Sequence, residues 1–146
     1  MENRNIEQQV WQRVRGANEP SPGNDLRQMQ REAMELAAAY RGLVAQFTGR
    51  QQEQTRQLYL GEKSNAQILS GIAMLSRQQG EALKLSQPGK EPAAKLLERC
   101  YHRTRRCMTE YLARSADGEY GAVGRIMADR EGEHCARIAE LLGSLG

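Results

Sequence analysis

The chain has 146 residues, with 21 Lys and Arg against 18 Asp and Glu and a formal net charge of +3. A chain of this length forms one domain and can bury a substantial core. The weak, interspersed charge predicts neither a nucleic-acid partner nor a membrane surface, and no apolar run is long enough for a signal peptide or a transmembrane helix.

Residues 1–24 form a segment ahead of the main domain, which we expect to span 25–146. Ile6, Val10, Trp11 and Val14 recur at helical spacing and predict a short helix, followed by a linker rich in Gly, Pro and Asn. In the simpler interpretation this helix docks on the domain. The alternative is that it binds a protein partner through Trp11, because tryptophan is an unusual residue to leave in water.

Four long helices are expected after this segment, because turn-forming residues separate stretches of helix-favouring composition. The first begins at a capping box, Asp25 to Gln28; the second covers about 51–79, the third opens at Pro92 and the fourth follows Gly118. Each carries a seam, a row of residues spaced three and four apart that would face a bundle core. The four seams are Leu26, Met29, Ala33, Leu36, Tyr40, Leu43 and Phe47; Leu58, Glu62, Asn65, Leu69, Ile72 and Leu75; Leu97, Cys100, Thr104, Cys107 or Met108, and Tyr111; and Tyr120, Val123, Met127, Glu131, His134, Ile138, Leu141 and Leu145.

These patterns predict an all-α protein, an antiparallel four-helix bundle with a short N-terminal helical extension and a long connection between its second and third helices. Cys100 and Cys107 stand seven residues apart on one helix, about 10 Å, which is too far for a disulfide. An odd number of cysteines without an export signal favours free thiols in a reducing cytoplasm. We expect buried cysteines to pack as small hydrophobes, with a role as metal ligand as the alternative.

The two halves of the chain share a layout. Ala33 precedes Tyr40 by seven residues, and Thr104 precedes Tyr111 by seven, at a displacement of 71 along the chain. On the helix that follows each pair, a Glu precedes a second polar residue by three positions. Side chains three apart share one face of a helix, so each half would present a polar pair to the core.

The polar pairs are Glu62 with Asn65 and Glu131 with His134, displaced by 69. This repeated layout resembles the ferritin-like superfamily, in particular rubrerythrin-like bundles, over residues 25–146. In that family a Glu on each of the first and third helices, and a Glu-x-x-His pair on each of the second and fourth, hold two metal ions in the core. The resemblance implies a ferritin-like fold and a redox or metal-handling function.

The resemblance carries over only part of the metal site. Glu131 and His134 match the fourth-helix motif and Glu62 matches the second-helix Glu, so these three are the expected metal ligands, whereas Asn65 stands where a second His would coordinate. A di-iron pair needs about four carboxylates and two imidazoles. The ligand count therefore favours no metal over one ion, and one ion over a pair; an ion here would be iron, manganese or zinc.

The other two carboxylate positions of the family are taken by Ala33 and Thr104. Asn65 and Thr104 are expected to donate hydrogen bonds around the site, and Tyr40 and Tyr111 to pack in the core with their hydroxyls bonded to a Glu. In a metal-free core, the facing carboxylates should push one pKa up. Glu32, Glu35 and His102 fall off the seam and should face outward or sideways. The basic residues Arg103, Arg105 and Arg106 are expected on the wet face of their helix, with an anion site as the alternative.

Two functions are consistent with this sequence. The first is a rubrerythrin-like, metal-binding bundle with a degenerate di-iron motif. The second is a non-catalytic bundle that has lost the metal and serves in assembly or protein interaction. No catalytic residue is assigned, no other cofactor motif is present, and a homodimer is the expected default for a bundle of long helices.

Overall fold

The computed structural model describes residues 22–75, 91–116 and 118–145. It contains four helices: α2 (Pro22–Gln46), α3 (Gly49–Leu75), α4 (Ala93–Arg114) and α5 (Gly121–Leu145). No strand occurs within these ranges, so the prediction of an all-α four-helix bundle is confirmed for the described part of the chain. The expected helix around Trp11 lies outside the described residues.

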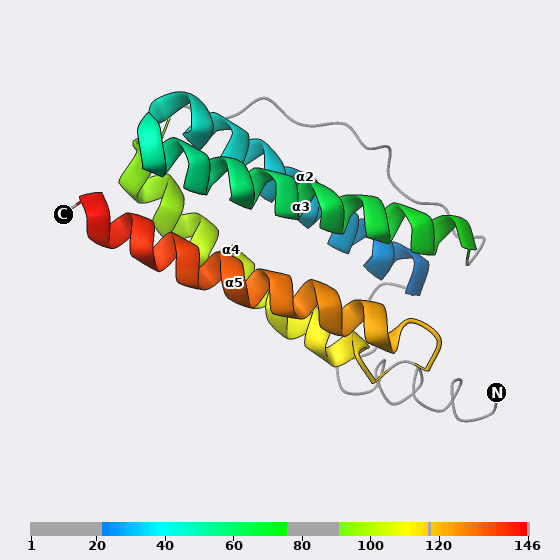
Figure 1. Ribbon diagram of the computed structural model, residues 1–146. Helices are drawn as coiled ribbons and strands as arrows, with labels where there is room; N and C mark the ends of the chain where they lie inside the picture. Colours follow the sequence, from blue (N-terminus) through cyan, green and yellow to red (C-terminus); the bar gives the residue numbers. More distant parts are fainter. Residues whose placement is uncertain (1–21, 76–90, 117, 146) are drawn as a thin grey trace.

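The helices form two hairpins packed face to face, as Figure 1 shows. α2 lies against α3 and α4 against α5, while across the bundle α2 contacts α4 and α3 contacts α5. Every contacting pair is antiparallel: Arg50 near the start of α3 pairs with Glu140 near the end of α5, and the amide of Gln46, the last residue of α2, reaches the carbonyl of Glu91 just before α4. α3 ends and α4 begins at opposite ends of the bundle, so these two helices run in the same direction.

Three of the predicted helix starts shift by a few residues. α2 begins at Pro22, three residues before the expected capping box at Asp25, because proline is well suited to a first helical turn. α3 begins at Gly49, whose φ of 60° lies in the left-handed region that a glycine adopts without strain. α4 begins at Ala93, with Pro92 as the residue that precedes the helix. Residues 76–79, expected at the end of the second helix, lie outside the described ranges.

The core follows the predicted seams along α2 and through the middle of the other helices. The seams are wrong at the helix ends, where Leu75 is 76% exposed and Leu145 is 39% exposed. An α-helix has 3.6 residues per turn, so a row spaced strictly by threes and fours drifts away from the core over several turns. Buried Thr55, Ala66 and Ala73 complete the core face of α3.

The three cysteines are free, as predicted. Cys100 and Cys107 are buried in the apolar core. Burial raises the pKa of the Cys100 thiol to about 12 and also raises that of Cys107. Both thiols therefore stay protonated and pack as small hydrophobes.

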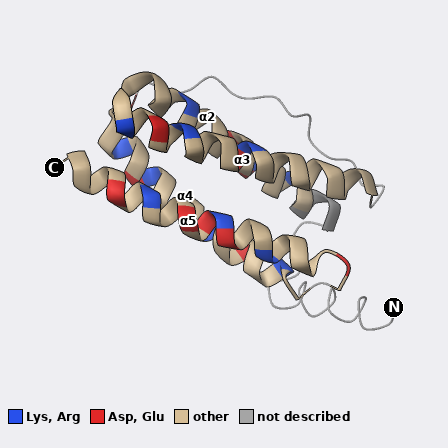
Figure 2. Cartoon of the chain, viewed as in Figure 1, with Lys and Arg blue, Asp and Glu red and all other residues tan. Residues whose placement is uncertain are grey.

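Acidic and basic residues are interspersed along α5, so this helix carries both signs of charge (Figure 2). A search of the described helices for a membrane-spanning segment, long and apolar enough to cross a bilayer, finds none.

Candidate metal centre

The three residues expected to bind metal come together in the middle of the bundle. Glu62 projects from α3, and Glu131 and His134 project from one face of α5. Both carboxylates are fully buried and His134 is 4% exposed. One ligand atom from each residue lies within 4.8 Å of the other two. Two helices separated in the sequence thus deliver an imidazole and two carboxylates to one point.

The imidazole meets both carboxylates through the same nitrogen. Nδ1 of His134 lies 3.1 Å from Oε2 of Glu62 and 3.7 Å from Oε2 of Glu131. The ring of Tyr40 lies edge-on to the imidazole, with ring centroids 6.1 Å apart. This packing fixes the plane of the ring and leaves Nδ1 directed at the carboxylates.

The other edge of the imidazole rests against a glycine. A Cβ placed on Gly61 would lie 2.4 Å from Nε2 of His134, closer than any real side chain permits, and 3.4 Å from the aliphatic stem of Arg130. Only glycine, which has no Cβ, leaves space for the imidazole at this turn of α3. No sequence pattern predicts this contact, because it depends on how α5 is positioned against α3.

A second set of contacts orients Glu131. Nδ2 of Asn65 donates a 2.7 Å hydrogen bond to Oε1 of Glu131, and Nη1 of Arg130 donates a 2.7 Å hydrogen bond to Oδ1 of Asn65. Asn65 therefore donates a hydrogen bond to one of the expected ligands, and Arg130 is a neighbour that sequence reasoning missed. Both polar atoms of the Asn65 side-chain amide are thus engaged, one by Glu131 and the other by the guanidinium of Arg130.

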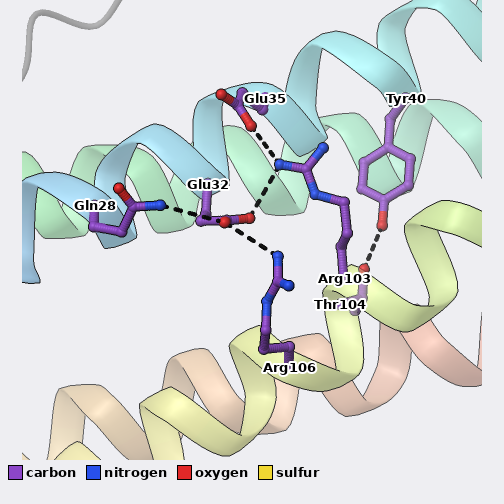
Figure 3. Close-up of polar contacts among 7 residues, drawn as sticks. All are labelled: Gln28, Glu32, Glu35, Tyr40, Arg103, Thr104 and Arg106. Carbon is purple, nitrogen blue, oxygen red and sulfur yellow. Dashed lines mark hydrogen bonds and ion pairs between the residues drawn. The ribbon is translucent and has the colours of Figure 1, made fainter. Parts of the chain in front are cut away.

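The predictions for Thr104 and the two tyrosines were wrong in their partners. The hydroxyls of Tyr40 and Thr104 bond to each other at 2.8 Å rather than to a carboxylate (Figure 3). The hydroxyl of Tyr111 is buried and has no hydrogen-bond partner among the described residues. Burial raises the pKa of both tyrosines well above the ordinary value, so both hydroxyls remain protonated.

The buried carboxylates need a positive charge or a proton. If both are ionised, Oε1 of Glu62 and Oε2 of Glu131 have no donor within the described part of the chain. Burial raises the pKa of Glu62 well above its ordinary value, and the charge of Glu131 and a hydrogen bond between the two carboxyl groups raise it further. The predicted upward shift of one carboxyl pKa is therefore confirmed. A proton shared between the two groups, or a bound cation, would satisfy them.

Polar residues off the seam form a separate cluster between α2 and α4. The guanidinium of Arg103 binds the carboxylates of both Glu32 and Glu35, and Arg106 binds Glu32 at 3.2 Å (Figure 3). The prediction that Glu32 and Glu35 avoid the core is confirmed, and His102 is exposed. The prediction that Arg103 lies on the wet face was wrong, because its side chain is only 23% exposed and bridges two helices.

The donor set fits a divalent transition-metal ion. Ligand atoms held at about 2.0–2.2 Å from one ion lie at most about 4.4 Å apart. The separations here are within 4.8 Å, so small side-chain movements would bring Nδ1 and one oxygen of each carboxylate onto a single ion. Two carboxylates and a neutral imidazole would also balance its double positive charge inside a dry core.

Comparison of the chain with models of protein families, with curated proteins and with solved structures finds no match.

Proposed function

We propose that this protein is a metal-binding bundle of ferritin-like, rubrerythrin type that holds one divalent ion between α3 and α5. Glu62, Glu131 and His134 are the ligands. The observation that carries this proposal is the convergence of one imidazole nitrogen and two carboxylates on one buried point. Iron, manganese and zinc all accept such a nitrogen and oxygen donor set.

The stoichiometry of one ion follows from charge. Two divalent ions would bring four positive charges to a core in which two carboxylates are available. Ala33 offers no donor atom, Thr104 is engaged with Tyr40, and Asn65 is engaged with Glu131 and Arg130. A di-iron pair is therefore disfavoured, and one ion with positions open to exogenous ligands is the proposed state.

The helix order supports the ferritin-like assignment. Two antiparallel hairpins in which α3 and α4 run in the same direction form a bundle with one long crossover, and ferritin-like folds have this topology. Fold likeness alone does not give a function, so the metal must be tested at the site.

A second candidate function is favoured by the hydrogen bonds that exist without an ion. The bonds from Asn65 to Glu131 and between His134 and Glu62 already satisfy half of the carboxylate oxygens. With one shared proton, the cluster closes as a polar core. A bundle of this kind would serve in assembly or protein interaction, as the sequence also allows.

Metal analysis of protein purified without chelators distinguishes the two functions. We expect about one iron, manganese or zinc per chain, and a melting temperature that rises when the missing ion is added to stripped protein. A ligand at a hundredfold excess over its Kd stabilises the fold by about 2.7 kcal/mol. Glu131→Ala should lose the ion and the thermal shift.

Glu133→Ala is the matched control, because Glu133 lies two residues away on α5 and is exposed. It should retain both the ion and the shift. If stripped protein melts identically with and without each of the three metals, the proposed metal site is wrong and the closed polar core is the better description.

A further inference from the structure

The sequence repeat corresponds to a repeated arrangement around the site. A displacement of 69 relates Glu62 to Glu131 and Asn65 to His134. The same displacement relates their contacts: His134 bonds Glu62, and Asn65 bonds Glu131. The site therefore has two equivalent halves, one built on an imidazole and the other on an amide.

The ring of Tyr40 packs against His134, and Tyr111 is the counterpart of Tyr40 in the sequence repeat, so we expect the two tyrosines at equivalent places beside the site. In the half that contains His134, the hydroxyl of Tyr40 is bonded to Thr104. The displacement of 71 that relates Tyr40 to Tyr111 also relates Thr104 to Ala33. In the sequence repeat, the counterpart of Thr104 is therefore Ala33, which has no hydroxyl, and the buried hydroxyl of Tyr111 lacks a partner among the residues described.

The charges of the two carboxylates also act on the hydroxyl of Tyr111. After burial, the negative charge of Glu62 is the largest cause that raises the pKa of Tyr111, and Glu131 contributes as well. The hydroxyl remains a neutral donor in the core. A buried donor left unsatisfied is unfavourable, so a ligand that accepts its hydrogen bond would bind favourably.

We propose that Tyr111 donates a hydrogen bond to a small exogenous ligand of the bound ion. The ligand is water or hydroxide in the resting protein, and a small anion can replace it. This inference rests on the proposed function, since it concerns the coordination positions that Glu62, Glu131 and His134 leave open. Tyr111 is a positioning residue for that ligand and does not bind the ion.

The test uses Co²⁺ as a visible probe and azide as the small anion. Full-length protein stripped of metal is loaded with Co²⁺, and azide is titrated while the visible absorption of Co²⁺ is recorded. We expect azide to change the spectrum at a saturable site. Tyr111→Phe should weaken azide binding by roughly tenfold, the loss expected for one hydrogen bond to a charged acceptor, and leave Co²⁺ affinity within about twofold.

Tyr101→Phe is the control, because Tyr101 lies on the same helix as Tyr111 and its half-buried ring packs against His102 rather than against the proposed ligands. It should leave azide affinity unchanged. If azide leaves the spectrum unaltered, or if the two variants weaken azide equally, the inference about Tyr111 is wrong while the metal site stands. If Co²⁺ itself does not bind the unmodified protein, the proposed function fails and this inference fails with it.

Discussion

At the scale of single residues, a substitution of Glu62 distinguishes what its buried charge costs in stability from what it contributes to metal binding. Glu62→Gln keeps the size of the side chain and removes the charge. The raised pKa of Glu62 means that its ionised form is unfavourable in the metal-free core. We expect metal-stripped Glu62→Gln to be at least as stable as the unmodified protein at pH 8 by chemical denaturation, and to bind the ion at least tenfold more weakly. A large loss of stability in the stripped variant would mean that the carboxylate has a structural partner other than Glu131 and His134.

Gly61 is the second residue whose role is visible only in three dimensions. In Gly61→Ala the new methyl group would collide with Nε2 of His134, so the imidazole must shift away from its present position. We expect a loss of at least tenfold in metal affinity, measured by competition with a chromophoric chelator. Backbone entropy alone would favour alanine in a helix by about 0.5–1 kcal/mol.

Gly71→Ala provides the comparison on the same helix, since a Cβ at Gly71 would meet no atom within 4 Å. It should raise the melting temperature and leave metal affinity unchanged. Equal behaviour of the two variants would contradict the assigned role of Gly61.

At the scale of helices, the ion-pair cluster joins α2 to α4. Glu32 and Glu35 lie on α2, and their repeat counterparts on α4 are Arg103 and Arg106, so equivalent positions of the two hairpins carry opposite charges. Arg103→Glu would place a third carboxylate among these partners. We expect a loss of roughly 1–2 kcal/mol in unfolding free energy, because the arginine is partly buried and bridges two acids.

Adding Glu32→Arg and Glu35→Arg to Arg103→Glu should recover part of that loss, since the side chain at position 103 again faces opposite charges. The recovery is only partial because Arg106 then faces a like charge at position 32. Arg125→Glu on the exposed surface of α5 is the control and should change stability by less than about 0.5 kcal/mol. Denaturant titrations of the variants measure both effects. A triple variant no more stable than Arg103→Glu would show that the arginine acts through packing rather than charge.

The helices also show how far sequence reasoning reaches. Spacing alone predicted the four helices and identified Glu62, Glu131 and His134 as core residues, because burial within one helix depends mainly on its own periodicity. It could not predict the bond between Tyr40 and Thr104 or the fit of His134 against Gly61. Those contacts depend on the register between neighbouring helices, which no single helix encodes. The predicted burial at the helix ends was wrong for a different reason: the expected seam continued past the point where the core stops, as at Leu75.

At the scale of the whole molecule, the metal-free protein and the metal-loaded protein should respond to pH in opposite directions. The folded pKa of Glu62 is raised, whereas the unfolded chain ionises near the ordinary value of 4.5. Between those two values the folded state binds the extra proton, so this group's contribution to stability is present at low pH and is lost as pH rises. Stripped protein should therefore lose stability from about pH 5 upward, by at most about 1.4 kcal/mol per pH unit from this group.

Metal reverses this dependence, because an ion replaces the proton and needs both carboxylates ionised and Nδ1 of His134 free. The stabilisation by added metal should grow as pH rises from 5.5 to 8, when protons no longer compete for the ligands. Unfolding titrations across this range, with a chelator and with saturating metal, measure both curves. In Glu62→Gln the stability of the stripped protein should fall less steeply with pH, and the stabilisation by added metal should shrink as well, because one carboxyl group controls both. If only one of the two changes, the proton and the ion occupy different places in the core.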